Sequence, residues 1–163
     1  MSVQALCLDP HPTLRAVARP VDVFSRDILQ LSRDLIDTMY ANDGIGLAAP
    51  QIGRDVQLLV ANPSHARGRE LVVANPIFDA VQGRAAVVEG CLSVPKRWER
   101  VRRAARVRLS GQDLSGEPVT VEAEGLLAII LQHEVDHLQG RLFIDRLSWF
   151  RRHRVERRVR QCG

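Results

Sequence analysis

The residues with the clearest chemical meaning are His133-Glu134-Val135-Asp136-His137. Four residues turn a helix through roughly 400°, so on a helix the imidazoles of His133 and His137 point the same way, with Cβ atoms roughly 6 Å apart. Two imidazoles at this spacing can hold one divalent ion. Glu134 follows the first histidine, where its carboxylate can take a proton from a water that the ion has acidified. The pattern indicates a metal-dependent hydrolase, although His-Glu-x-x-His alone occurs in many unrelated chains.

A third metal ligand is needed, because a catalytic site of this type usually takes three protein ligands and keeps one position open. Cys91, in the segment 89–93 (Glu-Gly-Cys-Leu-Ser), is the best candidate. A cysteine can ionise when it binds a metal, and Gly90 lets the backbone approach closely. The other cysteines, Cys7 and Cys162, form no disulfide-like spacing, which fits a reducing compartment.

Size and composition favour a soluble domain. The chain has 163 residues, of which 45% are hydrophobic and 26% charged, and a net charge of +4. No apolar run approaches the roughly 18 to 20 residues that span a bilayer, and the first residues lack the pattern of an export signal. We therefore expect a single domain over residues 1–163, with 150–163 as a basic C-terminal tail or helix, a cytoplasmic location and no membrane partner.

Three helices are predicted from the periodicity of apolar residues. The first spans about 25–41, with Ser25 as its N-cap. The second spans about 124–139 and carries the histidine motif, and its apolar first half favours a central, buried position. The third spans about 148–160 and is rich in arginine.

Short strands are predicted between the first two helices, because runs of β-branched and aliphatic residues alternate there with Gly, Pro, Asn and Asp. The candidate strands are residues 56–61, 71–74, 85–88, 106–109 and 118–121. The segment 44–51 is predicted to be a loop of small residues. The fold class is α+β: short, mostly antiparallel β-strands around a central metal-binding helix, with an N-terminal helix and a C-terminal basic helix.

Arg103 is predicted to point inward, because we assign it the same strand parity as Val107. A buried arginine needs a carboxylate partner, and we propose Glu89, since this pair would stiffen the loop that carries Cys91. Asp136 has two interpretations: it orients a ligand histidine, or it faces a basic strand.

Three segments together resemble the peptide deformylase family. The signatures Gly-x-Gly-Leu-Ala-Ala-x-Gln, Glu-Gly-Cys-Leu-Ser and Gln-His-Glu-x-Asp-His stand intact and in order at 44–51, 89–93 and 132–137. With similar residues near the start, the resemblance covers roughly residues 5–150. It implies an enzyme that hydrolyses the N-formyl group from the N-terminal formyl-methionine of nascent polypeptides and releases formate.

The resemblance also implies roles for individual residues. The metal ligands would be Cys91, His133 and His137. They would bind Fe²⁺, with Zn²⁺, Ni²⁺ or Co²⁺ as substitutes, and Glu134 would be the general base. The Gln51 side chain and the Leu92 backbone N–H would stabilise negative charge on the formyl oxygen.

The substrate methionine is expected to enter an apolar wall beside the histidines, which suits a flexible thioether. Backbone groups around Gly46 could pair with the extended peptide as an added strand. Trp98 stands where relatives often have an arginine near the peptide channel. The expected substrate-contacting residues are Ile45, Gly46, Val87, Glu89, Gly90, Leu126, Ile129 and Ile130.

Other functions are also consistent with parts of the sequence. A peptidase could use the same water, but Cys91 and the accompanying loops argue against it. A nucleic-acid-binding module with a structural metal would need a fourth ligand, which the motifs lack. A deformylase-like protein with lost activity could serve as a ribosome- or nucleic-acid-binding module. The arginine-rich end is either a solvated terminus or a contact with ribosomal RNA, and we expect a monomer.

Overall fold

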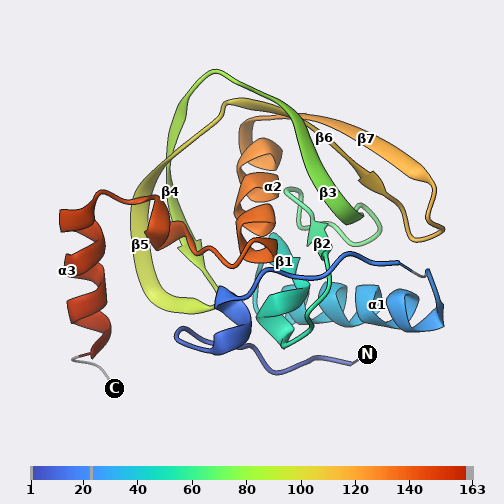
Figure 1. The fold of residues 1–163 in the computed structure, drawn as a ribbon, viewed down its shortest axis with the longest axis horizontal. Helices are drawn as coiled ribbons and strands as arrows, with labels where there is room; N and C mark the ends of the chain where they lie inside the picture. Colours follow the sequence, from blue (N-terminus) through green and yellow to red (C-terminus); the bar gives the residue numbers. More distant parts are fainter. Residues whose placement is uncertain (1, 23, 161–163) are drawn as a thin grey trace.

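The computed structural model describes residues 2–22 and 24–160, and it places helix α2 (Gly125–Leu138) in the middle of the molecule (Figure 1). A five-stranded sheet lies on one side of α2, and the hairpin of β4 and β5 lies on the other. Helix α1 (Arg26–Ala41) runs below the sheet, and α3 (Trp149–Arg160) lies outside the hairpin. This arrangement confirms the predicted α+β fold around a central helix.

The helices begin and end close to where the sequence predicts. Ser25 caps α1, since its side chain accepts a hydrogen bond from the Asp27 N–H at 3.2 Å. Helix α2 ends before Gly140, whose φ of +69° suits glycine. A Cβ at Gly140 would lie 2.6 Å from the carbonyl oxygen of Arg15, so this glycine also allows two distant chain segments to meet.

The main sheet is entirely antiparallel, in the order β1-β2-β3-β6-β7. Its strands are β1 (Gly46–Ala48), β2 (Leu58–Ala61), β3 (Leu71–Gln82), β6 (Arg106–Gln112) and β7 (Pro118–Glu124). The apolar face of the sheet packs against α2 through residues such as Leu59, Leu109 and Leu131, which are fully buried. Strand β1 is at one edge of the sheet, beside α2.

The hairpin of β4 (Ala85–Cys91) and β5 (Val94–Arg103) closes the other side of α2. Its register shifts between Gly90 and Cys91, where the strand ends. Three short 3₁₀ helices join the parts: η1 (Pro12–Arg15), η2 (Ala49–Ile52) and η3 (Phe143–Arg146). Val101 of the hairpin, Phe143 of η3 and Val155 of α3 share one buried apolar cluster.

Several predicted boundaries were wrong. The segment expected to be a loop contains β1 and η2, β3 is much longer than 71–74, and β5 was not predicted. Leu126 is 51% exposed, because α2 starts directly after the edge strand β7 and its burial begins only at Ala128. The predicted tail residues 161–163, including Cys162, lie outside the described residues.

Arg103 is buried as predicted, but for a different reason. It ends β5, whereas Val107 belongs to β6, and the two strands are in different sheets. The side chain of Arg103 points inward from the hairpin together with Val101, while Arg102 points to solvent. The prediction assumed that inward and outward positions alternate without interruption from Arg103 to Val107. Ala104 and Ala105 interrupt that alternation, because they lie between the two strands.

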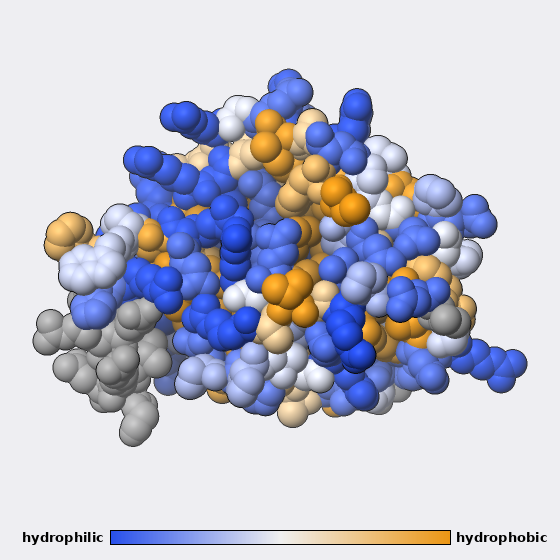
Figure 2. All heavy atoms as spheres, viewed as in Figure 1, coloured by the Kyte–Doolittle hydropathy of each residue, from blue (hydrophilic) through white to orange (hydrophobic). Residues whose placement is uncertain are grey.

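The surface carries many hydrophilic side chains (Figure 2), as the 26% of charged residues in the sequence leads one to expect. Figure 2 shows hydrophilic side chains over much of one face, with apolar side chains in small groups between them. Among the described residues, no helix combines the length and the apolar character needed to cross a membrane.

Candidate metal centre

Cys91, His133 and His137 form the candidate metal centre. Their ligand atoms all lie within 4.8 Å of one another, and Cys91 Sγ is 3.2 Å from His137 Nε2. The two imidazoles come from successive turns of α2, with ring centroids 5.0 Å apart, and the thiol comes from the end of β4. One thiolate and two imidazoles form a donor set typical of a transition-metal ion. The three residues predicted as metal ligands therefore lie together in the structure.

Glu89 orients the first histidine. Its Oε2 accepts a hydrogen bond from His133 Nδ1 at 2.8 Å, which leaves Nε2 of that ring for a metal. Arg103 donates to both carboxylate oxygens of Glu89, at 2.8 and 2.9 Å. Burial by itself would raise the pKa of Glu89, but the hydrogen bonds from Arg103 and His133 outweigh it and lower the pKa to about 2. The predicted pair of Glu89 and Arg103 is confirmed.

This pairing also bears on the expected substrate contact of Glu89. The residue is 6% exposed, and both of its carboxylate oxygens are hydrogen-bonded in the interior. Any contact of Glu89 with a substrate would therefore come from its backbone. The histidine motif does not predict that Glu89 is the hydrogen-bond partner of a ligand histidine. The sequence indicated Glu89 only as the carboxylate partner of the inward Arg103.

Asp136 faces arginines, in agreement with the second interpretation of its role. Arg103 of β5 donates to its Oδ2 at 2.5 Å, and Arg146 donates to both oxygens from the end of η3. A continuous chain of hydrogen bonds therefore runs from His133 through Glu89, Arg103 and Asp136 to Arg146. Arg146 was not identified from the sequence, because nothing in the motifs points to it.

Glu134 lies beside the metal ligands with one oxygen unpaired. It is 4% exposed, and its Oε2 has no hydrogen-bond partner among the described residues. Burial raises the pKa of its carboxyl to about 7, and the nearby negative charge of Glu89 adds to this effect. A buried carboxylate oxygen without a partner is costly, so this atom is suited to a group that arrives with the metal or the substrate.

Gln51 is held with its amide nitrogen toward Cys91. The Ala48 backbone N–H donates to Gln51 Oε1 at 2.8 Å, which fixes the orientation of the amide. Its Nε2 lies 3.3 Å from Ser93 Oγ and 3.7 Å from Cys91 Sγ. Gln51, in η2, is 2% exposed, so the packing of the interior holds this donor in place. Leu92 lies between Cys91 and Ser93 in the hairpin turn, and the role of its N–H stays a prediction.

The residues expected to form the apolar wall differ in their burial. Ile129 and Ile130 are buried, Ile45 and Val87 are half-buried, and Leu126 is exposed. Their contact with a substrate remains a prediction.

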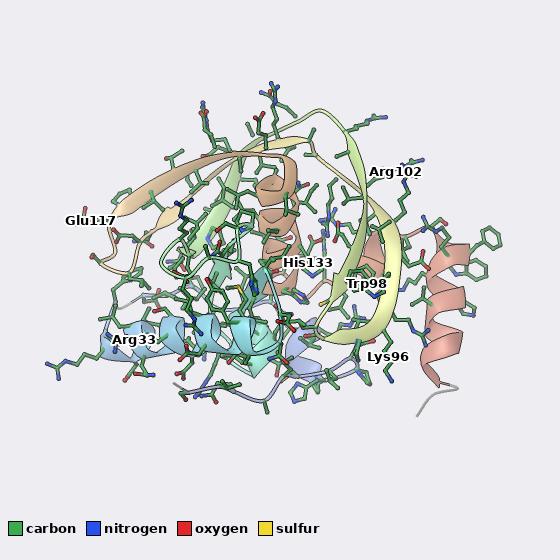
Figure 3. The ribbon with its side chains drawn as sticks, turned by 180° about the vertical axis from the view of Figure 1, so that it is seen from behind. Arg33, Lys96, Trp98, Arg102, Glu117 and His133 are labelled. Carbon is green, nitrogen blue, oxygen red and sulfur yellow. The ribbon has the colours of Figure 1, made fainter. Side chains whose placement is uncertain are left out.

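Two glycines have close neighbours at the site. A Cβ at Gly46 would lie 2.5 Å from Glu134 Oε1, and one at Gly90 would lie 2.7 Å from the ring of Trp98. Trp98, which Figure 3 shows on the hairpin outside His133, is 71% exposed. Both glycines therefore provide room that a larger residue would fill.

Comparison with known proteins agrees with this site. The family described as polypeptide deformylase matches residues 3–153. A peptide deformylase of Acinetobacter baumannii (strain SDF) is 43% identical over 151 residues, which are 92% of this chain and 86% of the relative.

Solved structures show the same fold. The peptide deformylase of Legionella pneumophila superposes with a TM-score of 0.93 at 38% identity, over 98% of this chain and 95% of that one. The peptide deformylase of Thermus thermophilus gives a TM-score of 0.91 at 42% identity, over 98% and 94% of the two chains. On the agreement of sequence, fold and metal-ligand geometry, this chain belongs to the polypeptide deformylase family.

Proposed function

We propose that the cluster of Cys91, His133 and His137 is the centre at which this enzyme removes the formyl group from the N-terminal formyl-methionine of nascent polypeptides. The observation that carries the proposal is the meeting of three metal-ligand side chains with a buried, unpaired Glu134 oxygen. A bound divalent ion would acidify a water and polarise the formyl carbonyl. The products would be formate and a peptide with a free amino terminus.

The roles of the chain's own groups follow from their positions. Glu134 is the general base: it accepts a proton from the attacking water at Oε2 and returns it to the departing amine. Gln51 Nε2 and the Leu92 backbone N–H donate to the formyl oxygen as negative charge develops there. Because Gln51 Oε1 is already occupied by the Ala48 N–H, the amide presents a donor without further rearrangement.

Substrate binding is proposed along β1. This strand pairs with β2 on one side only, so its outer edge is available for an extended peptide that adds as a strand. The methionine side chain would then contact Ile45, Val87 and the α2 residues Leu126, Ile129 and Ile130, while the backbones of Gly46, Glu89 and Gly90 would line the peptide. Residues after the methionine would extend toward Trp98.

The proposed native metal is Fe²⁺, with Zn²⁺, Ni²⁺ or Co²⁺ as substitutes. A mixed thiolate and imidazole site accepts any of these ions, and the usual affinity order favours Zn²⁺ over Fe²⁺. Metal analysis of protein purified without oxygen tests this assignment. Iron in stoichiometric amount with high turnover would support it, whereas full activity in a zinc form that contains no iron would contradict it.

A deformylase and a peptidase can be distinguished by their products. Incubated with a formyl-methionyl tripeptide, this protein should release formate and leave the tripeptide whole. Shorter peptides from an unformylated substrate would indicate a peptidase instead. The inactive, binding-only alternative is not favoured, because every residue the chemistry needs is present at the site.

We also propose a cytoplasmic monomer that meets its substrate at the ribosome through the basic C-terminal segment. The sequence beyond Val155 carries three arginines and one glutamate, whose side chains lie outside the described residues. A truncation after Val155 should weaken co-sedimentation with ribosomes at low salt but leave turnover of a free peptide unchanged. Equal ribosome affinity of the two proteins would contradict this proposal.

A further inference from the structure

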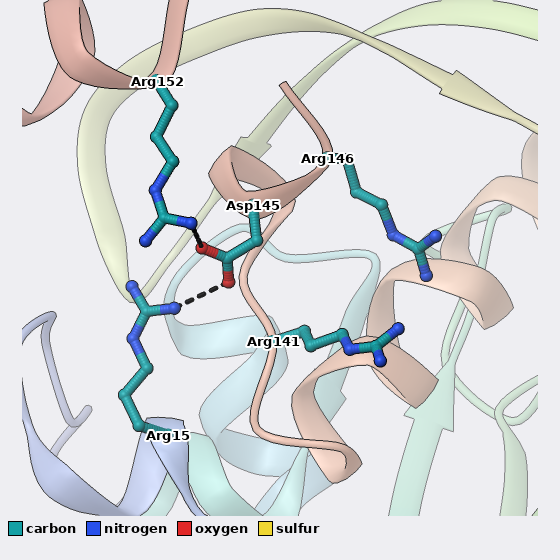
Figure 4. A pocket seen from close by; sticks show the side chains of 5 residues that line it. All are labelled: Arg15, Arg141, Asp145, Arg146 and Arg152. Carbon is teal, nitrogen blue, oxygen red and sulfur yellow. Dashed lines mark hydrogen bonds and ion pairs between the residues drawn. The ribbon is translucent and has the colours of Figure 1, made fainter. Parts of the chain in front are cut away.

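Four arginines, from η1, η3, α3 and the segment between α2 and η3, surround a surface hollow that has no part in the proposed reaction. The hollow has a volume of about 440 Å³. It is lined by Arg15, Arg141, Asp145, Arg146 and Arg152. Figure 4 shows Arg15 and Arg152 converging on Asp145, while Arg141 and Arg146 extend on the other side. None of these residues is one of the three candidate metal ligands.

The fold brings these side chains together by specific contacts. The turn at Gly140 brings Arg141, which follows the end of α2 by three residues, next to the segment of Arg15. Asp145 is fixed in η3, where its Oδ2 accepts from the Leu142 backbone N–H at 2.8 Å and from Arg15 at 2.6 Å. Arg152 of α3 lies 3.1 Å from the other oxygen of the same carboxylate. The cluster is therefore built from both the N-terminal and C-terminal parts of the chain.

Carboxylates offset most of this positive charge, but not all of it. Arg15 faces Asp9 as well as Asp145, and Arg146 faces Asp136. Arg141, by contrast, is exposed, and its side chain makes no hydrogen bond or ion pair with any other described residue. Its full set of N–H donors is available at the hollow.

Arg146 also keeps N–H donors that its ion pair does not use. A guanidinium has five N–H groups, and the contact of Arg146 with Asp136 uses only its Nε and one terminal nitrogen. A phosphate group carries up to two negative charges and several acceptor oxygens, so it can accept hydrogen bonds from arginines on different sides at once. A monovalent carboxylate offers less charge and fewer oxygens.

We propose that this hollow binds a phosphate group, either as a free phosphate anion or as part of a phosphodiester chain. Arg141 is the principal donor, and Arg146 contributes from the same side of Asp145 (Figure 4). The lining arginines keep their ion pairs with Asp145 and Asp136 when the ligand binds.

Titration of inorganic phosphate against the zinc-loaded protein at constant ionic strength, followed by ³¹P NMR, tests the proposal. Arg141→Gln should weaken phosphate binding about tenfold, because a hydrogen bond to a charged group is lost. Arg33→Gln is the matched control: it removes the same charge from an exposed position on α1 (Figure 3) that does not line the hollow, and it should leave the affinity unchanged.

A second titration with a short, labelled single-stranded RNA distinguishes the two sources of phosphate. If Arg141→Gln weakens both RNA and phosphate binding, the hollow accepts a phosphodiester; if it weakens only phosphate binding, the ligand is a free anion. Equal phosphate affinity of the parent, Arg141→Gln and Arg33→Gln proteins would overturn the proposal, since any phosphate would then be bound at the metal or without a defined site.

Discussion

At the scale of single residues, the orientation of the histidine motif depends on a carboxylate outside it. Glu89, from the hairpin, holds Nδ1 of His133, and Arg103 keeps that carboxylate ionised. A hydrogen-bonded partner behind a ligand histidine fixes its tautomer and ring position. The metal centre therefore requires two elements in fixed relation, the helix that carries the imidazoles and the hairpin that carries both Cys91 and Glu89.

Replacing Arg103 with methionine should strongly destabilise the fold. The side chain is 2% exposed and lies between Glu89 and Asp136, so its loss leaves two buried carboxylates with less compensation. We expect a loss of about 3–5 kcal/mol in the free energy of unfolding, measured with urea. Arg102→Met at the exposed neighbouring position is the control, and an equal loss in both variants would contradict this role of the buried pair.

Replacing Gln51 with leucine should lower kcat by about 10²–10³, because a donor to the developing negative charge is removed. KM and metal content should change little. Ser93→Ala removes a partner of the same amide but keeps the donor, so most of the rate should remain. A raised KM with an unchanged kcat in Gln51→Leu would show that Gln51 binds the substrate rather than stabilising the transition state.

At the scale of elements, the sequence predicted the helices better than the strands. Apolar periodicity and caps define α1 and α2 locally, and their observed bounds differ from the predicted ones by only a residue or so. Strand β5 was missed because its six charged residues and single tryptophan give no apolar run; the hairpin partner and the buried cluster below it make it a strand. The composition of a short segment does not show which distant strand it pairs with.

Like the helix boundaries, the site residues on α2 could be predicted because their pattern is local in the sequence. Spacing within α2 is local, so His133, Glu134 and His137 could be assigned to one face of a helix before the fold was known. The approach of β1 to α2 could not be assigned in this way, since it depends on two segments far apart in the chain. It is nevertheless the contact that confines Glu134, through Gly46.

Gly46→Ala tests that contact. The added methyl would lie 2.5 Å from Glu134 Oε1 and 2.7 Å from Ile130, so either β1 or the catalytic carboxylate must move. We expect a loss of about 1–3 kcal/mol in stability and a lower kcat, with the metal retained. Gly44→Ala, whose nearest contacts would be 3.1 Å or longer, should have a smaller effect on kcat. Equal kcat values for the two variants would argue against a tight fit at Gly46.

At the scale of the whole molecule, the central helix is enclosed by parts from both ends of the chain. The sheet covers one side of α2, and the hairpin, η1 and η3 close the other (Figure 1). Val155 of α3 packs into the apolar cluster of the hairpin, η1 and η3, and only 3% of its surface is exposed. The basic C-terminal helix is therefore attached to the hairpin that carries Cys91, at least as far as Val155.

Val155→Ala should destabilise the folded protein by about 1–2 kcal/mol, because it removes buried methyl groups from the cluster shared with Phe143 and Val101. Val17→Ala, at a position that is 69% exposed, should change the free energy of unfolding by less than about 0.5 kcal/mol. If thermal unfolding of the two variants is the same, α3 does not contribute to the stability of the domain.

The most direct test of the proposed catalytic site is formate release from a formyl-methionyl tripeptide by protein prepared anaerobically with Fe²⁺, compared with Glu134→Ala carrying the same metal. We predict turnover in the parent and a loss of at least about 10²-fold in the variant, with the metal content unchanged. Comparable turnover in the two proteins would show that Glu134 is not the base, and no formate from the metal-loaded parent would contradict deformylation at this centre.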